Sequence, residues 1–540
     1  MALTSRVGGS SAMTSEVLLD SRRPAPLEAR TEPRATRLRR ALLSPWWLLA
    51  LVVAIPGVFL RVWHIDSLGV NSDEAVYAGQ AASLAGDPEL SPFFPIFRAH
   101  PLLFQGMLSV VYHFGGVSTL AGRLMSAAFG LGTVVLLYFI GRLLYDRRVG
   151  FVAALIGSVM PYLVVVNRQI LLDGPMTFFA TLALYLMARF AQSLQPVWLY
   201  AASGVLGLTF LAKETSILLL GGVYAFLALT RTITVRLRHL VIASAIYLAI
   251  ILVYPVTVAL SGASSTGRNF LVWQLLRRAN HSWLFYPSVV PVAIGIPVVL
   301  AAIAGLWFLR KRSAWQEKLL IWWILGPVIF FEIWAVKGYQ YLLPIAAPVA
   351  VLAARALCAI PRRVSIRRWR LSGTALFLAA TTVTVSWLLL TSVVKIMPAT
   401  AGTAFLAGTG GVPGGREAGQ WIDANLPKDS QMLALGPSMA NIIQFYGHRK
   451  TYALSVSPNP LHRNPVYEPV NNPDLAIRHN NLQYIVWDSF SAERSPFFSE
   501  NLMKYTKRYH GEVVHSESVL VDTPVGKVEK PVIVIYQVRP

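Results

Sequence analysis

Long apolar runs recur along most of this 540-residue chain, and they constrain its fold more than any other feature. Each run covers roughly 17–25 residues, which is enough for a helix to cross the ~30 Å hydrocarbon core of a bilayer. Hydrophobic residues make up 55% of the chain and charged residues only 14%, against about 25% charged residues in soluble domains. The sequence therefore predicts a mainly α-helical protein, built as a polytopic membrane helix bundle.

We expect about eleven transmembrane helices within a transmembrane domain at 46–397. The expected spans lie near 46–62, 120–140, 149–166, 175–192, 197–212, 215–230, 239–260, 287–309, 319–336, 341–360 and 372–396. The first span lacks a small-residue cleavage site, which predicts a retained anchor rather than a signal peptide. Residues 1–45 are rich in Arg, Ser and Pro without an apolar period, so we expect a disordered cytoplasmic tail.

The net charge of +22 is distributed as membrane topology rather than as a nucleic-acid surface. Basic residues cluster in short loops around 142–148, 231–238, 310–318 and 362–370. A cytoplasmic N-terminus places all of these loops in the cytoplasm, as the positive-inside rule requires. The C-terminus is then extracytoplasmic, and no nucleic-acid partner is expected. Short basic loops and a single cysteine, Cys358, fit a multi-pass protein of a bacterial plasma membrane.

Two regions are expected outside the membrane on the external side. The first is the long loop 63–119, whose semi-apolar stretch at 101–114 predicts a helix along the membrane interface. A Gly-rich linker at 398–415 leads to the second, a small extracytoplasmic α/β C-terminal domain at 416–540. Short apolar runs in it predict strands, at 432–436, 484–488 and 532–538. We expect this domain to be a lid, an acceptor platform or a partner surface.

Asp73 and Glu74 are adjacent acids in NSDEAVYAG (71–79), a segment expected to be a polar loop after the first span. An acid pair at the mouth of an apolar bundle is costly to desolvate, which favours a functional site over a helix cap or a solvated loop. Further polar residues lie near the same ends of the spans: His100, Arg123, Arg168, Asp173, Lys213, Glu214, Glu332, Lys337 and Tyr341. In a cleft there, a carboxylate would deprotonate a nucleophile while cations hold a phosphate leaving group.

Five segments, in this order, resemble the glycosyltransferase C superfamily and especially its protein mannosyltransferase and lipid A aminoarabinose transferase group. They are SDEAVYA (72–78), HPLLF (100–104), GRLMSAAFG (122–130), NRQILLDGPMTFF (167–179) and KGYQYLLPIAAP (337–348). The resemblance covers about residues 46–360. It implies an inverting membrane enzyme that transfers a sugar from a polyprenyl-phosphate donor to an acceptor on the external face. The sugar is left open, as is the acceptor, which would be a protein, a lipid or a glycan.

The resemblance also implies roles for single residues. Asp73 matches the catalytic base, and Glu74 matches its neighbour, which orients the acceptor or Asp73. For the donor phosphate, Lys337 is our first choice and Lys213 the second, although a lysine can also simply mark the end of a span. The remaining candidates are Arg123, Arg168 and Tyr341 for the phosphate, and His100 and Asp173 for substrate. Their structural alternatives are interfacial snorkelling, a helix cap and the aromatic belt of the membrane.

His100 distinguishes the two branches of this group. Aminoarabinose transferases carry a phosphate-binding Lys at this place and mannosyltransferases a His, and Leu102 stands where the family segment has its second proline. This favours a neutral hexose donor and leaves the role of His100 open. Because Lys and Arg can supply the positive charge that a phosphate needs, we expect no essential metal and no other required cofactor, although acids can gather a divalent cation.

Two other classes of function compete with this one. A transporter or flippase for a lipid-linked or anionic substrate usually shows internal repeats and ionisable residues at the bilayer midplane. Here no repeat is evident, and the polar residues gather at one face. A non-catalytic scaffold on the same fold is the third possibility, and the intact acids argue against it.

Overall fold

A computed structural model of the chain describes the following residues: 45–97, 100–262, 269–270, 272–274, 276–277, 279–310, 315–361, 363–366, 369–397, 412–457, 459, 463–464, 466–523 and 526–540. The chain divides into two units, Met1–Ala50 and Leu51–Pro540, and the second holds everything that follows. Almost all of the expected tail at 1–45, and residues 398–411 of the expected linker, lie outside the described residues.

Helices occupy each of the eleven expected spans within the described part of the chain. They are α2 (Pro45–Val62), α5 (Thr119–Leu144), α6 (Arg147–Val159) with α7 (Pro161–Val166), α8 (Asp173–Ser193), α9 (Pro196–Ala212), η1 (Glu214–Ile217) with α10 (Leu218–Leu229), α11 (Leu237–Ile251) with α12 (Val253–Leu260), α14 (Phe285–Ile294) with α15 (Ile296–Gly305) and η2 (Leu306–Arg310), α16 (Trp315–Ile333), η3 (Tyr339–Ile345) with α17 (Ala346–Cys358), and α18 (Gly373–Ile396). Five spans are long and apolar enough to cross a membrane, or six if the pair α14–α15, bent by 95°, counts as one. The chain is a multi-pass membrane protein, and the total of eleven spans stays a prediction.

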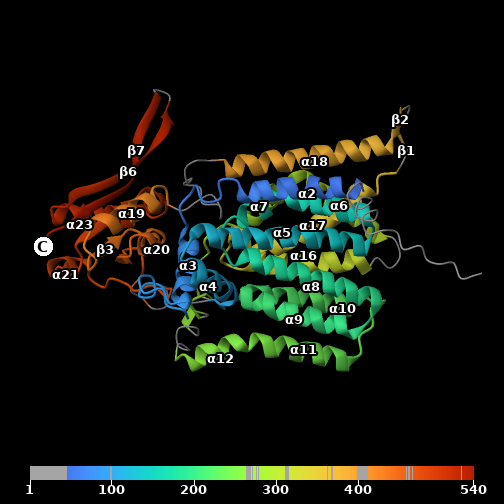
Figure 1. The fold of residues 1–540 in the computed structure, drawn as a ribbon, viewed down its shortest axis with the longest axis horizontal. Helices are drawn as coiled ribbons and strands as arrows, with labels where there is room; N and C mark the ends of the chain where they lie inside the picture. Colours follow the sequence, from blue (N-terminus) through green and yellow to red (C-terminus); the bar gives the residue numbers. More distant parts are fainter. Residues whose placement is uncertain are drawn as a thin grey trace, which may run out of the picture. The chain divides into compact units, whose positions relative to one another are not determined.

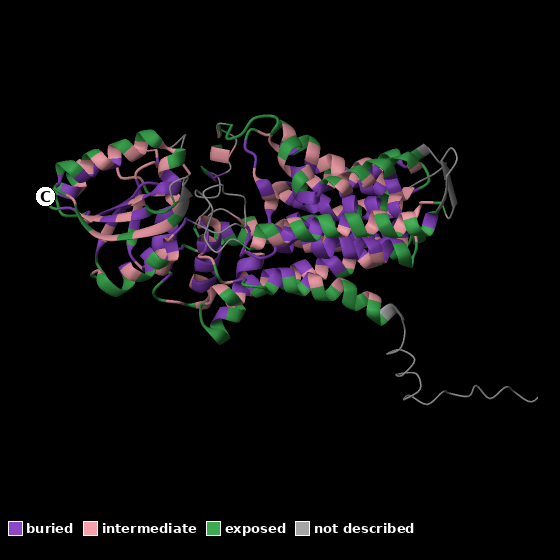
Figure 2. Cartoon of the chain, turned by 90° about the horizontal axis from the view of Figure 1, so that it is seen from above, coloured by how far each residue is buried: buried purple, intermediate pink, exposed green. Residues whose placement is uncertain are grey.

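The centre of the bundle is formed by α6, α8 and α17. α8 packs against α5 and α9, and α17 packs against α6 and α15 (Figure 1). These central helices are buried along most of their length, whereas most side chains of α11 and α18 are at least partly exposed. In Figure 2 the buried residues lie mainly in the interior of the bundle and the exposed residues along its outside. Because the exposed side chains of α11 and α18 are mainly apolar, these helices face the lipid.

The predicted loop 63–119 contains two helices, α3 (Ser72–Ala85) and α4 (Leu103–Gly115). The expectation of a polar loop at 71–79 is therefore wrong. Asn71 caps α3, because its side chain accepts hydrogen bonds from the backbone N–H groups of Asp73 and Glu74, and Glu74 in turn accepts from the N–H of Asn71. This reciprocal capping box starts a helix. The helix expected near 101–114 corresponds to α4.

The C-terminal region contains helices and a small sheet, as expected, and is called the α/β domain below; its bounds and its extracytoplasmic position stay predictions. It contains α19 (Gly415–Asn425), β3 (Gln431–Ala434), α20 (Pro437–Tyr446), β4 (Lys450–Ala453), α21 (Pro473–Arg478), β5 (Tyr484–Asp488), α22 (Ser489–Arg494), α23 (Pro496–Arg508), β6 (Glu512–Thr523) and β7 (Gly526–Gln537). The sheet order is β4-β3-β5-β7-β6, with β3 parallel to β4 and β5, and β7 antiparallel to β5 and β6. A further antiparallel pair that we did not expect, β1 (Arg363–Ile366) and β2 (Trp369–Ser372), joins α17 to α18.

The α/β domain contacts the segment that carries the acid pair. α20 packs against α3. Arg416 donates to the backbone oxygens of Asp66 and Leu68, at 2.9 and 2.6 Å. The amide of Asn441 in α20 donates to the Ser72 hydroxyl at 2.9 Å. These bonds tie the domain to the start of α3, so the domain bears directly on where Asp73 lies.

Candidate active site

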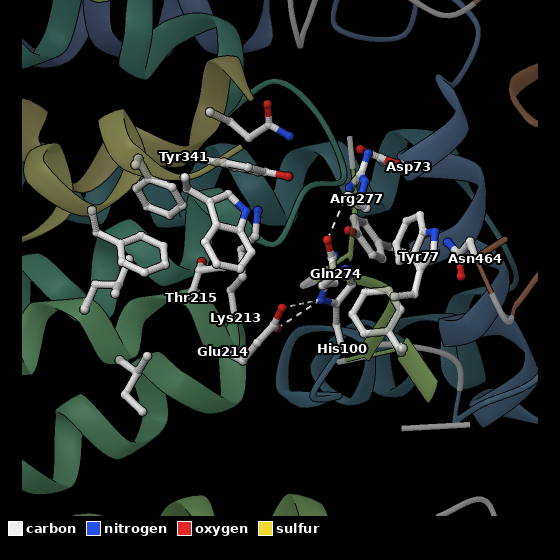
Figure 3. A pocket seen from close by; sticks show the side chains of 18 of the residues that line it. Asp73, Tyr77, His100, Lys213, Glu214, Thr215, Gln274, Arg277, Tyr341 and Asn464 are labelled. Carbon is white, nitrogen blue, oxygen red and sulfur yellow. Dashed lines mark hydrogen bonds and ion pairs between the residues drawn. The ribbon is translucent and has the colours of Figure 1, made fainter. Parts of the chain in front are cut away.

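A cavity of about 650 Å³ lies where several distant segments meet (Figure 3). Its walls come from α3, the corner at 213–218, the described parts of 269–277, α16, η3 and the C-terminal domain. Five of the residues singled out from the sequence line it: Asp73, His100, Lys213, Glu214 and Tyr341. The expectation that polar and charged residues far apart in the sequence converge therefore holds for these five.

Asp73 lies in the first turn of α3 and faces this cavity. Its backbone N–H is bonded to Asn71, but among the described residues no side chain makes a hydrogen bond or an ion pair with its carboxylate. Burial raises the pKa of Asp73 above its usual value, and the nearby charges of Lys213, His100 and Arg277 offset part of that rise. A carboxylate that is uncommitted and has a raised pKa is suited to accept a proton.

Lys213 joins the cavity to a buried acid. Its ammonium group donates to both carboxylate oxygens of Asp173, each at 2.8 Å, and lies 4.9 Å from the ring centre of Tyr341. Asp173 begins α8 and does not itself line the cavity. Asp173 therefore acts on the cavity through Lys213, by holding the ammonium group at the wall.

His100 forms a second fixed pair with Glu214. Its Nδ1 lies 3.0 and 2.9 Å from the two carboxylate oxygens. Both side chains line the cavity and keep about a fifth to a quarter of their surface exposed. Glu214 thus binds His100 rather than its sequence neighbour Lys213, which binds Asp173.

Glu74 and Arg123 form a buried pair away from the cavity. Nε and Nη2 of Arg123 each donate to one carboxylate oxygen at 2.9 Å, and the backbone N–H of Ile170 donates to the same carboxylate at 3.0 Å. Arg123 also donates to the backbone oxygens of Ile65, Leu68 and Gly69. Both side chains are at most 3% exposed. Their structure assigns them to holding α3 in place rather than to contacting substrate.

Arg168 and Lys337 also lie outside the cavity wall. Arg168 donates to the backbone oxygens of Leu60 and His64. Lys337 donates to the last carbonyls of α16, those of Phe331 and Glu332, at 3.3 and 2.7 Å. Cations bind the orphan carbonyls at a helix C-terminus favourably. Lys337 therefore satisfies the end of α16, and the structure offers no direct support for our first choice of phosphate ligand.

Several lining residues were not proposed from the sequence. Arg277, Gln274 and Trp273 come from the segment before α14, and Asn464 and Tyr467 come from the C-terminal domain. Arg277 stacks on Trp273 and donates to Gln274 at 3.3 Å. The sequence feature that could have identified Arg277 is an arginine pair, RR at 277–278, in a loop predicted to be external. Arginines there run against the positive-inside rule and so call for a local explanation.

Comparisons with known proteins show which proteins this chain is similar to. The family model of dolichyl-phosphate-mannose-protein mannosyltransferases matches residues 99–258. ArnT from Cupriavidus metallidurans bound to undecaprenyl phosphate has a TM-score of 0.64 at 14% identity, covering 91% of this chain and 98% of ArnT. The oligosaccharyltransferase AglB from Archaeoglobus fulgidus, in complex with an inhibitory peptide and a dolichol-phosphate, has a TM-score of 0.54 at 14% identity, covering 90% and 74%. No curated protein matches the sequence.

The chain has the glycosyltransferase C fold. The resemblance stated from the five sequence segments is thereby confirmed, although the family model covers less than a third of the chain. A glycosyltransferase C fold does not favour the alternative of a transporter or flippase.

Within the described part of the chain, the cavity offers no clear set of metal ligands. Among the described residues, no group of three or more His, Cys, Asp or Glu side chains is placed to hold a metal ion. Asp173 and Glu214 already have cationic or imidazole partners. The absence of an essential metal stays a prediction.

Proposed function

We propose that this protein is a membrane glycosyltransferase that moves a sugar from a polyprenyl phosphate to an acceptor hydroxyl on the external face. The observation that carries the proposal is the position of Asp73. Its carboxylate lacks a side-chain partner among the described residues, and it faces a cavity that also presents Lys213 and Arg277. A base opposite two cations suits a reaction in which a nucleophile loses a proton and a phosphate leaves.

The reaction follows from these positions. Asp73 accepts the proton of the acceptor hydroxyl, and that oxygen forms a bond to the anomeric carbon of the donor sugar. The bond from this carbon to the phosphate oxygen breaks, and the polyprenyl phosphate leaves with the electron pair. Attack opposite the leaving group inverts the anomeric configuration, and Asp73 later returns its proton to solvent.

Lys213 and Arg277 are the cations proposed to hold the phosphate. Lys213 is fixed by Asp173 at the cavity wall, and Arg277 lines the same wall from the segment before α14. They replace Lys337 as the first choice, because the Lys337 ammonium group is bound to the end of α16. Arginine also offers the planar, bidentate donor geometry that phosphate oxygens accept.

An apolar groove beside the cavity suits the polyprenyl chain. Its volume is about 450 Å³, and α16 supplies most of its wall, including Ile329 and Ile333. Gln274, Phe330 and Trp334 line both the groove and the main cavity. A lipid whose phosphate lies near Arg277 would therefore find an apolar path for its tail along the membrane-facing side of α16.

The test is the substitution Asp73→Asn in the full-length protein, reconstituted in membranes with radiolabelled polyprenyl-phosphate hexoses and an envelope extract as acceptor. Removal of a general base lowers rates by about 10²–10⁴-fold, so transfer should fall in that range while donor binding persists. Asp429→Asn, at an exposed acid in the C-terminal domain, is the matched control. Full transfer by the Asp73→Asn protein would overturn the proposal.

A further inference from the structure

A second cleft, polar and separate from the lipid groove, lies beside the candidate active site. Its volume is about 160 Å³, and it runs between the loop after α3, at Pro92 and Pro95, and the C-terminal domain, at α20 and β4. β4 is an edge strand of the sheet. None of its lining residues takes part in the transfer step described above.

The cleft leads toward Asp73. A small chamber of about 80 Å³ separates it from the main cavity. Val466 and Tyr467 line both the cleft and the chamber, while Asp73 and Asn464 line both the chamber and the main cavity. Because they share these lining residues, the cleft, the chamber and the main cavity lie next to one another. The cleft and the apolar groove on α16 have no lining residue in common, so they are distinct approaches to the site.

Neutral hydrogen-bonding groups form part of the cleft wall. Asn441 and Gln444 of α20 contribute amides, and Thr451 of β4 contributes a hydroxyl that donates to the Arg449 carbonyl. Lys450 and Glu468, both exposed, form an ion pair at 2.7 Å, so their charges cancel. Among its lining residues the cleft therefore has no unpaired charge that would favour an anionic or cationic ligand over a neutral one.

Flat apolar surfaces complete the lining. The rings of Phe93, Tyr452 and Tyr467 and the prolines of the loop after α3 face the same space as the amides. A sugar ring has the complementary surface, with hydroxyl groups at its edge and C–H groups on its faces. The amide nitrogens of Asn441 and Gln444 already donate to the Ser72 hydroxyl and the Thr451 carbonyl. Their amide oxygens can accept hydrogen bonds from the hydroxyl groups of a sugar, which an acyl chain lacks.

We propose that this cleft binds the acceptor, and that the acceptor is a neutral, hydroxyl-rich glycan whose terminal sugar passes through the chamber to Asp73. The identity of this ligand as the acceptor rests on the proposed function. Binding of a glycan in the cleft does not, because it needs neither a donor nor the base.

The experiment measures binding of short neutral manno- and arabino-oligosaccharides to the full-length protein in nanodiscs, by ligand-observed NMR and without donor. Gln444→Trp fills the cleft and should abolish binding. Gln444→Leu removes the amide at nearly constant volume, and loss of a hydrogen bond of about 1.4 kcal/mol corresponds to about tenfold weaker binding. Gln420→Trp, at an exposed position of α19, is the matched control and should bind as the unmodified protein does.

Asp73→Asn should retain oligosaccharide binding, which separates this inference from the proposed function. If Asp73→Asn abolishes transfer but the oligosaccharides do not bind the unmodified protein, the cleft proposal is wrong and the catalytic proposal stands. Binding that survives Gln444→Trp also overturns it. Preferential binding of a Ser/Thr-rich peptide or a phosphorylated oligosaccharide, measured in the same assay, would assign the cleft to a different acceptor and refute the neutral glycan. A thermal melt of each variant confirms that loss of binding does not reflect unfolding.

Discussion

The acids in and near the cavity differ in whether a basic side chain already binds their carboxylate. Glu74, Asp173 and Glu214 each have a basic partner within 3.0 Å, whereas Asp73 has none among the described side chains. A balanced carboxylate is a poor base, because its partner stabilises the charged form. This contrast, rather than the presence of two adjacent acids, singles out Asp73.

The protonation of Asp73 gives a prediction about pH. Burial raises its pKa, so the acid stays protonated to higher pH than usual, and transfer should rise as pH increases through that pKa. Arg277 lowers the pKa of Asp73. Arg277→Gln should therefore move the acid limb of kcat/KM to higher pH, while Arg277→Lys, which keeps the charge, should leave it near its original position. A limb that stays fixed in Arg277→Gln would show that another group titrates.

At the level of single residues, part of the site could be predicted from the sequence. The order and level of Asp73, His100, Lys213 and Tyr341 could be inferred, because the ends of the spans fix their depth. The direction of a side chain could not. Lys337 lies at the expected corner, yet its ammonium group binds the carbonyls of Phe331 and Glu332. Whether a lysine faces a cavity or a helix end depends on packing that no linear pattern contains.

Among the secondary-structure elements, α3 determines what each acid of the pair Asp73 and Glu74 faces. Consecutive residues of an α-helix point about 100° apart, so one acid faces the cavity and the other faces Arg123. The pattern Asn71-x-x-Glu74 is a capping box, so a helix start was available from the sequence. The polar character of the segment favoured a loop instead. Three strands of the C-terminal domain, β3, β5 and β7, were predictable because their apolar runs are short and bounded by turn residues, whereas β4 and β6 were not predicted.

The Glu74–Arg123 pair predicts a loss of stability for Glu74→Gln. Breaking a buried ion pair on one side costs about 3–5 kcal/mol, and it frees the start of α3 to move. We expect a lower thermal unfolding temperature and slower transfer. Because the Glu74 charge raises the pKa of Asp73, the acid limb of the pH profile should also move to lower pH. The double variant Glu74→Gln with Arg123→Gln should be less destabilised than the two single changes combined.

Glu89→Gln, at an exposed acid just beyond α3, is the matched control for this change. Loss of transfer in Glu74→Gln at an unchanged unfolding temperature would assign Glu74 a direct part in the chemistry, as the resemblance to the family first implied.

On the scale of the whole molecule, the bundle and the α/β domain are joined at α3. Arg416, Tyr446 and Asn441 of the domain bond to Asp66, Val70 and Ser72 around the start of that helix. Within the same region, Gly79 lets α3 pack closely on the loop that borders the polar cleft, because a Cβ at this position would lie 2.3 Å from the ring of Phe94. The hydrogen bonds between the domain and α3 could not be predicted from the sequence, since they join residues more than 300 positions apart.

Arg416→Gln should loosen this junction. The variant loses its charged hydrogen bonds to the Asp66 and Leu68 carbonyls, which contribute about 1.5–3 kcal/mol each. Amide hydrogen exchange in α3 and α20 should become faster, and transfer should fall several-fold although the catalytic residues are unchanged. Arg539→Gln, whose side chain is exposed, should change neither. Equal amide exchange rates in α3 and α20 of the Arg416→Gln variant and of the unmodified protein would show that Arg416 does not hold the junction.

Asn464 and Tyr467 give the C-terminal domain a share of the wall around Asp73. A chimera that borrowed this portion from a relative would thus inherit a different rim to its reaction chamber. Under the proposed function, exchanging this portion should therefore change which acceptor is used while the donor lipid stays the same.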